Sequence, residues 1–204
     1  MKNKKIKFLL IINFINLIGF QAFAPFYAIF VTNAVGINES MIGLVWGLYS
    51  LLIAITLLVM GRLENKLNKE KAIIVGYLIL AIAAYLFLFV NSLIALIIVL
   101  AFNALGAGIA MPAYKTLFTK FQDKDRESEE WSWLDAGNMI AASIGVTTGG
   151  IIVGIFGFNG IFIFMGTIQG IAAIIAIKTF GFNGANTAKN IFKSKYAKRL
   201  LAVK

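Results

Sequence analysis

The chain has 204 residues, of which 60% are hydrophobic and 14% are charged, and its net charge is +10. A soluble domain of this length has too little interior for so much apolar surface, so the composition indicates a membrane protein. Cysteine and histidine are both absent, which excludes a disulfide framework, a thiol metal site and the commonest metal ligand. We therefore expect no metal, no cofactor and no enzymatic activity.

Charged residues divide the sequence into long apolar intervals. Only Glu39 lies between Lys7 and Arg62, and no charge lies within 72–114 or 136–177. A membrane-spanning helix takes roughly 20 apolar residues, so each interval has room for two, and turn formers stand near the three middles, at 32–40, 91–92 and 157–160. The pattern predicts an all-α membrane protein. We expect residues 1–180 to form a bundle of six transmembrane helices, near 8–31, 41–60, 72–90, 92–114, 132–156 and 158–178.

The first predicted helix also has the features of a cleavable signal peptide. A signal peptide is therefore the alternative to a retained membrane-spanning helix. A basic start and an apolar run are followed by Ala22, Phe23 and Ala24, a small-residue pattern typical of a cleavage site. We expect a retained helix because the apolar run continues through Pro25 to Val31.

The positions of the basic residues predict the topology. All 19 lysines and arginines lie in the tails or between the predicted hairpins, and none lies in a hairpin turn. Because short cytoplasmic loops carry the Lys/Arg excess, we expect both termini in the cytoplasm and a multi-pass protein of the cytoplasmic membrane. Nucleic-acid binding is the competing explanation of the charge, but the basic residues flank spans at intervals and form no single patch. We therefore expect the lipid bilayer as a partner, and no nucleic acid.

The segment GRLENKLNKEK at 61–71, between the second and third predicted helices, is unusually charged. Its spacing resembles the signature loop of the major facilitator superfamily of secondary transporters. Four residues match that pattern, namely Gly61, Leu63, Lys66 and Lys69. Three replace its aspartate, its second glycine and its second basic residue, namely Asn65, Asn68 and Glu70. The resemblance implies a latch between transporter halves, in which Glu64 could supply the missing carboxylate; the alternative is a loop that only sets topology.

Three further segments resemble the same family in the same order. They are PFYAIFVTNAVGINESMIGLVWGLYSL at 25–51, NALGAGIAMPAYKTLF at 103–118 and GVTTGGIIVGIFGFNGIFIF at 145–164. The resemblance covers about residues 20–180 and implies the N-terminal six-helix half of a transporter, built from 3+3 helix repeats, with the substrate site between two halves. Residues 181–204 then resemble the linker between halves, as a basic amphipathic cytoplasmic tail lying on the anionic inner leaflet.

Small residues repeat at helical spacing in the fourth and fifth predicted helices. Lipid gives helices no hydrophobic drive to associate, so small residues that let backbones approach carry the contact. The packing candidates are Gly106, Gly108, Gly145, Gly149, Gly150 and Gly154. In the family's antiporters the fifth helix carries a glycine and proline motif; Gly149 and Gly154 match it, but Gly150 stands where the proline would be. Static packing and a role in motion both remain open.

Polar residues within membrane spans are functional candidates, because burying them in lipid is costly. Eight residues are candidates for a substrate cavity: Asn13, Asn16, Phe20, Gln21, Trp46, Tyr49, Asn103 and Asn138. They lie on the first, second, fourth and fifth helices, which the resemblance implies as the cavity-lining ones. The third and sixth helices are peripheral in the family and, apart from Gln169, nearly free of polar residues. The alternative for each amide is a hydrogen bond between helices.

The expected function is transport of a small, neutral or zwitterionic solute by alternating access. Asp135 is the only acidic candidate for coupling within a span, and Leu100 takes the place of an arginine of the family's fourth helix. We expect this half to act with a second six-helix half or in a homodimer, through the small residues of the fifth helix. The alternative is a non-transporting membrane scaffold or regulatory subunit derived from a transporter half.

Overall fold

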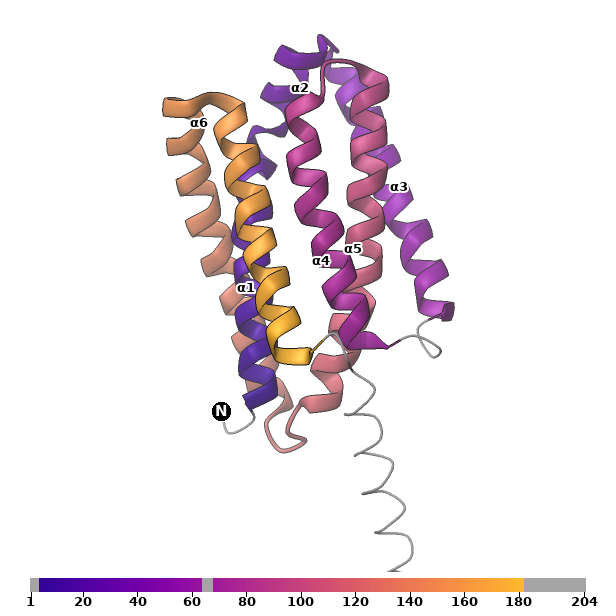
Figure 1. The fold of residues 1–204 in the computed structure, drawn as a ribbon, viewed down its shortest axis with the longest axis vertical. Helices are drawn as coiled ribbons and strands as arrows, with labels where there is room; N and C mark the ends of the chain where they lie inside the picture. The colour runs from indigo at the N-terminus through magenta and orange to yellow at the C-terminus, as the bar shows by residue number, and fades with distance from the viewer. Residues whose placement is uncertain (1–3, 64–67, 182–204) are drawn as a thin grey trace, which may run out of the picture.

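The computed structural model describes residues 4–63 and 68–181, which form helices joined by short connections and contain no strand (Figure 1). The elements are α1 (Lys4–Phe23), η1 (Ala24–Phe26), α2 (Tyr27–Val35), α3 (Glu39–Leu63), α4 (Lys69–Leu86), η3 (Phe87–Phe89), α5 (Leu93–Phe121) and α6 (Glu127–Phe180). In the described ranges, 5 helical segments are long and apolar enough to cross a membrane, and α6 with its 54 residues is the longest. The all-α prediction is confirmed for this part of the chain.

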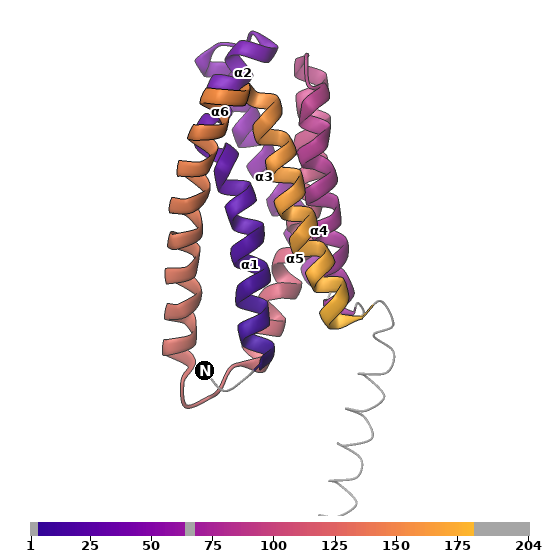
Figure 2. The same cartoon turned by 60° about the vertical axis from the view of Figure 1, so that its left-hand side comes forward.

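α6 reverses direction at one residue. Gly157 has φ 68° and ψ −168°, outside the helical region, and Figure 2 shows the two limbs of α6 running in opposite directions from this bend, with α1 between them. We call residues 127–156 the first limb and residues 158–180 the second limb. The sequence predicts two helices that meet at 157–160, and α6 consists of two helices that meet at the non-helical residue Gly157.

The first predicted helix, 8–31, is interrupted near its middle. Pro25 lies in the short 3₁₀ turn η1 between α1 and α2, because proline lacks the backbone N–H that a continuing α-helix requires. α2 then ends at Gly36, whose φ of 72° is the left-handed conformation favoured by glycine at helix C-termini. The outer turn predicted at 32–40 is therefore shorter, at 36–38.

Polar side chains begin three of the other helices. The Met41 amide donates to Asn38 Oδ1 (3.0 Å), the Lys71 amide to Asn68 Oδ1 (3.1 Å) and the Ala95 amide to Ser92 Oγ (3.3 Å), which satisfies amides left free in a first helical turn. α5 continues to Phe121, beyond the predicted end at 114, and α6 begins at Glu127 rather than 132. Hydropathy marks the apolar part of a helix, whereas the helix itself continues into water.

α1 lies between the two limbs of α6, α4 packs against α5 and α6, and α3 packs mainly against α5 (Figures 1 and 2). We call the end with the connections at 36–38, 90–92 and 157 the turn end, and the opposite end, with residue 4 and the connection 122–126, the loop end. Val45 and Tyr49 are the only buried residues of α3. α3 is thus the least enclosed helix of the described chain.

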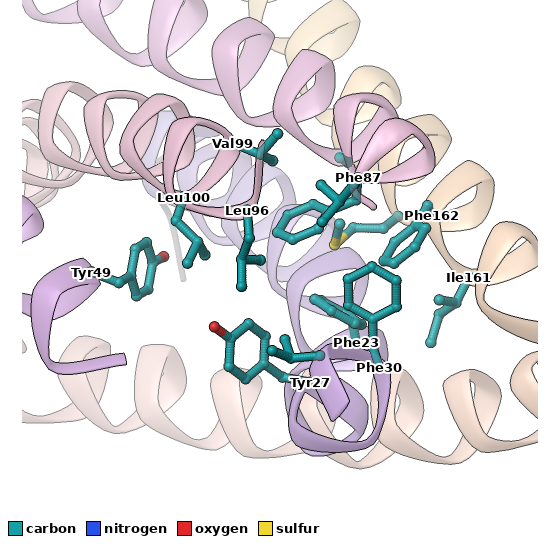
Figure 3. Packing of buried hydrophobic residues seen from close by; sticks show 14 of the residues in the cluster. Phe23, Tyr27, Phe30, Tyr49, Phe87, Leu96, Val99, Leu100, Ile161 and Phe162 are labelled. Atoms are coloured by element: carbon teal, nitrogen blue, oxygen red, sulfur yellow. The ribbon is translucent and has the colours of Figure 1, made fainter. Parts of the chain in front are cut away.

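Two apolar clusters fill the bundle, one toward each end. The cluster at the turn end is aromatic: Phe162 packs against Phe23, Phe30 and Phe87 with ring centroids 5.0, 4.8 and 5.3 Å apart (Figure 3). The cluster at the loop end contains residues of α1, α4, α5 and both limbs of α6. Two polar side chains, Asn16 and Gln169, lie along their helices between residues of one cluster and residues of the other. Asn103 lies beside Ala104 and Tyr49 of the turn-end cluster.

Four of the six packing glycines lie against another helix. A Cβ at Gly145 would stand 2.6 Å from Ile18 O of α1, and one at Gly149 would overlap Ala22 O. Gly106 stands against Gly76 O of α4, and Gly108 against Thr56 of α3. Close backbone approach within the bundle therefore explains all four.

The other two packing glycines, Gly150 and Gly154, lack such a close contact with another helix. The nearest atom to a Cβ at Gly150 is Phe26 Cζ at 3.4 Å, an ordinary contact, and none lies within 4 Å at Gly154. Gly154 therefore has no close contact within the described chain, and its role in packing stays a prediction. Spacing shows that two glycines share a face but does not show what that face meets.

Candidate functional site

A cavity of about 420 Å³ lies at the centre of the bundle. Its lining comes from α1, α3, α4, α5 and both limbs of α6. Six of the eight candidate residues line it, namely Asn13, Asn16, Phe20, Tyr49, Asn103 and Asn138. The cavity thus brings together candidate residues, such as Asn13 and Asn138, that lie 125 positions apart in the sequence.

Trp46 and Gln21 lie elsewhere. Trp46 packs on Tyr27 and Tyr49, with ring centroids 4.8 and 5.4 Å apart, beside a hollow of about 20 Å³. Gln21 lies at the contact between α1 and α6, where its Cβ would be 3.0 Å from one added at Gly145. Neither residue is among those that line the central cavity.

Two hydrogen bonds join polar residues of the cavity across helices. Asn13 Nδ2 donates to Asn138 Oδ1 (2.7 Å), and the Tyr49 hydroxyl donates to Asn103 Oδ1 (2.8 Å). Hydrogen bonding between helices, the alternative to a role in solute binding, therefore accounts for Asn13, Asn138 and Asn103. It does not account for Asn16.

Several polar atoms in the cavity wall are buried and have no hydrogen-bond partner. They are Asn16 Oδ1, the Tyr114 hydroxyl and both Oε1 and Nε2 of Gln169. A buried polar atom left unpaired costs roughly 1–3 kcal/mol, so such atoms are rarely left alone without a reason. These atoms are buried within the wall and are not exposed to the cavity itself.

The cavity wall contains five notable residues that sequence patterning did not select: Tyr77, Tyr114, Lys115, Trp131 and Gln169. Two of these, Tyr77 on α4 and Gln169 on the second limb of α6, come from the helices expected to be peripheral. Lys115, counted in the sequence as a topology signal, is the one charged residue among the described lining residues.

The cavity is narrow toward the turn end and continues toward the loop end. Beyond Phe20 and Tyr49, the aromatic packing around Phe23 and Tyr27 leaves only about 20 Å³. In Figure 3, Tyr49 stands apart from the phenylalanine rings of this cluster. In the other direction the lining continues to Lys115 and Trp131, near the loop-end termini of α5 and α6.

A second hollow of about 230 Å³ lies beside the first, between α1 and the first limb of α6. Its other lining is largely apolar and includes Ile11, Phe14 and Trp133. Asn13 and Asn138 line both hollows. Their hydrogen bond therefore stands between an amide-lined space and an apolar one.

The remaining sequence candidates lie away from the cavity. Asp135 is exposed and lines neither hollow. Gly61 has no neighbouring atom within 4 Å of an added Cβ, and Leu63 and Lys69 lie at the adjoining helix ends. The other loop residues of the signature, Glu64, Asn65 and Lys66, and the tail at 182–204 lie outside the described residues.

Comparison with known proteins gives one family. The profile of the Major Facilitator Superfamily matches residues 9–202. An uncharacterized MFS-type transporter of Methanocaldococcus jannaschii is 24% identical over 166 residues, which are 81% of this chain and 43% of that protein. The riboflavin transporter RibZ of Clostridioides difficile is 30% identical over 142 residues, 70% of this chain and 31% of that protein. The match thus spans less than half the length of either relative.

Proposed function

The chain belongs to the Major Facilitator Superfamily and is a multi-pass integral membrane protein; from this premise we propose that it moves a small solute across the cytoplasmic membrane by alternating access. The observation that supports this proposal is the central cavity, with unpaired polar atoms of Asn16, Tyr114 and Gln169 in its wall. A merely structural bundle gains nothing from unpaired buried amides. Because these atoms are buried in this conformation, a solute pairs with them only when the helices move, as the proposed alternating access requires.

We propose that the chain supplies one half of the transporter. Counted by limbs, α6 contributes two spans, which gives the six of the proposed half. A second six-helix half or a second copy of the chain supplies the opposite wall of the cavity. Gly145 and Gly149 are already occupied by α1, so the partner is not contacted through these two glycines; the poorly enclosed α3 offers a larger free surface.

The proposed topology places the loop end in the cytoplasm and the turn end outside. Cysteines introduced at Asn38, Asn91 and Asn159 are then expected to react with an impermeant thiol reagent in intact cells. A cysteine at Asn68 reacts only after the membrane is permeabilised, because all basic residues are expected on one side. The native chain has no cysteine, so labelling has no background. Labelling at Asn68 in sealed cells would reverse the topology.

Transport is tested with the full chain in liposomes, alone and together with any protein that copurifies with it. Riboflavin is the first labelled solute to try, because one relative is named as its transporter. Replacing Asn16 by Leu is expected to lower uptake roughly tenfold, the effect of losing about 1.4 kcal/mol, whereas the exposed Ile94→Leu change leaves uptake unaltered. A folded, inserted chain that carries no solute in either preparation contradicts the proposal.

The alternative, a non-transporting scaffold or regulatory subunit, also has support. Among the described residues that line the cavity there is no carboxylate, the group through which many proton-coupled transporters titrate. This alternative predicts a stable complex with a membrane partner whose activity changes when the chain is removed. Uptake by the chain in liposomes that carry no other protein would exclude it.

A further inference from the structure

Lys115 of α5 is the one charged residue among the described residues that line the central cavity. It is exposed, and it forms no ion pair with any described residue. We propose that Lys115 makes the cavity selective for small organic anions, by holding a carboxylate or phosphate group of the solute toward the loop end. This inference rests on the proposed function and names the class of solute.

The position of Lys115 on α5 distinguishes it from a lysine that only marks the end of a span. Asn103, Ala107 and Met111 precede it at intervals of four residues, and all three line the cavity, so Lys115 continues a lining stripe along one helix face. Lys120, in the last turn of α5, does not line it. The preference for basic residues on the cytoplasmic side accounts for a lysine at this end of a helix, but not for its place on the lining face.

The charge of Lys115 is not balanced within the cavity. No carboxylate is among the described residues of the lining, so the ammonium group gives this end of the cavity a positive potential, which walls of low dielectric constant strengthen. A cationic solute is repelled there, and an anionic one is attracted. The sequence alone favoured a neutral or zwitterionic solute, and the lining therefore points to a different class.

The amides of the lining add mainly hydrogen-bond donors. Asn16 Oδ1 is buried, Asn103 Oδ1 accepts from the Tyr49 hydroxyl, and Asn138 Oδ1 accepts from Asn13 Nδ2. In contrast, Nδ2 of Asn16, Asn103 and Asn138 has no partner in the described chain and is not among its buried polar atoms. Asn13 Oδ1 is the amide oxygen left open. Three N–H donors thus accompany the ammonium group, and such donors bind an anionic oxygen more strongly than a neutral one.

The size and the other side chains of the cavity define suitable probes. Its volume of about 420 Å³ is in the range of pockets that bind small organic molecules. Phe20 and Trp131 line it as well and supply ring surface. Benzoate and phenyl phosphate each combine a ring with an anionic group, and benzamide and phenol are their uncharged counterparts.

The first test measures the charge that a solute meets in the cavity. Met111 lies one turn before Lys115 and is 42% exposed, and the native chain has no cysteine. The purified full chain with Met111→Cys is treated, in uncharged detergent at low salt, with an anionic sulfonate or a cationic trimethylammonium methanethiosulfonate. Each rate is divided by the rate with a free thiol in solution. A positive charge about 6 Å away is expected to favour the anionic reagent by roughly fivefold to tenfold.

Three substitutions in the Met111→Cys chain assign that preference to one residue. Lys115→Gln is expected to reduce it to within about twofold, whereas Lys115→Arg keeps the charge and the preference. Lys120→Gln is the matched control, because it removes the same charge from the same helix outside the cavity lining. It is expected to leave the preference unchanged.

The second test measures binding through protection of the same cysteine from an uncharged thiol reagent. Benzoate or phenyl phosphate is expected to protect at a concentration at least tenfold lower than benzamide or phenol, and Lys115→Gln is expected to remove this difference. A phospholipid headgroup offers the same phosphate chemistry, so phosphatidylglycerol is tested alongside. Protection by this lipid but by neither small anion would assign Lys115 to the membrane surface and overturn the proposal.

The remaining outcomes separate this inference from the proposed function. Equal relative rates for the two charged reagents, no reaction with either, or a preference that survives Lys115→Gln would overturn the role of Lys115, as would a lack of protection by both anions. Liposome uptake of a neutral solute that Lys115→Gln leaves unaltered would support transport and overturn anion selectivity. Dependence on Lys115 in both tests, with no uptake of any solute, would leave anion binding intact and remove transport.

Discussion

Gly149→Ala is expected to destabilise the folded chain by about 1–3 kcal/mol, the range for a side chain forced into a packed contact. The added Cβ would overlap Ala22 O, with Ala22 Cα at 2.9 Å. These are backbone atoms of α1, so no rotamer change relieves the overlap. α1 and the first limb of α6 would have to separate along their whole contact, which includes Gly145 and Ile18.

Gly154→Ala is the control for this change, because it adds the same methyl group to the same helix. No atom lies within 4 Å of the added Cβ, and alanine is favoured over glycine in helices by roughly 1 kcal/mol. It is therefore expected to leave stability unchanged or to raise it slightly. Thermal unfolding of both variants in one detergent measures the difference. Equal midpoints for the two would mean that α1 and α6 do not touch as described.

Tyr49→Phe is expected to cost about 1–3 kcal/mol of stability, because it leaves the buried Asn103 Oδ1 without its donor. Asn103 is 5% exposed, and its oxygen accepts from the Tyr49 hydroxyl at 2.8 Å. This bond connects α3 to α5, the helix on which α3 mainly rests. Because α3 buries few other side chains, we expect it to be the first helix to loosen.

A double-mutant cycle isolates this interaction. Tyr49→Phe and Asn103→Leu each remove one partner, and the double variant should lose less stability than the sum of the two, by about 0.5–3 kcal/mol. Ser50→Ala is the control, since the exposed Ser50 hydroxyl bonds only within α3, to Trp46 O. Additive losses in the cycle would show that the bond does not couple the helices.

The helices could be predicted because charge is excluded from lipid. A lysine or carboxylate in the middle of a span is so costly that the uncharged intervals alone locate the spans. The same argument does not locate helix ends, which is why α5 passes Lys115 and reaches Phe121. It also does not give the bend at Pro25, which depends on a missing backbone donor.

The cavity could be predicted only in part. A helical stripe such as Asn13, Asn16 and Phe20 gives the face that residues share, and this face does line the cavity. The position of a side chain along the bundle axis, and its distance from other helices, depend on packing and not on the sequence pattern. For this reason the sequence did not predict that Trp46 lies beside the aromatic cluster or that Gln169 lines the cavity. The roles of Lys66 and Asn65 in the loop remain predictions, and Asn65→Asp would test them.

The reversal at Gly157 has a mechanical consequence. A connection of one residue contains no slack, so the two limbs of α6 cannot slide past each other along their axes. α1 is held between them, with Gly149 of one limb against Ala22 and Gly19 against Gln169 of the other. We therefore expect α1 and the two limbs of α6 to move together as one rigid unit. If the bundle rocks, as the proposed alternating access requires, we expect the motion to occur around these segments, where α3 has few buried residues.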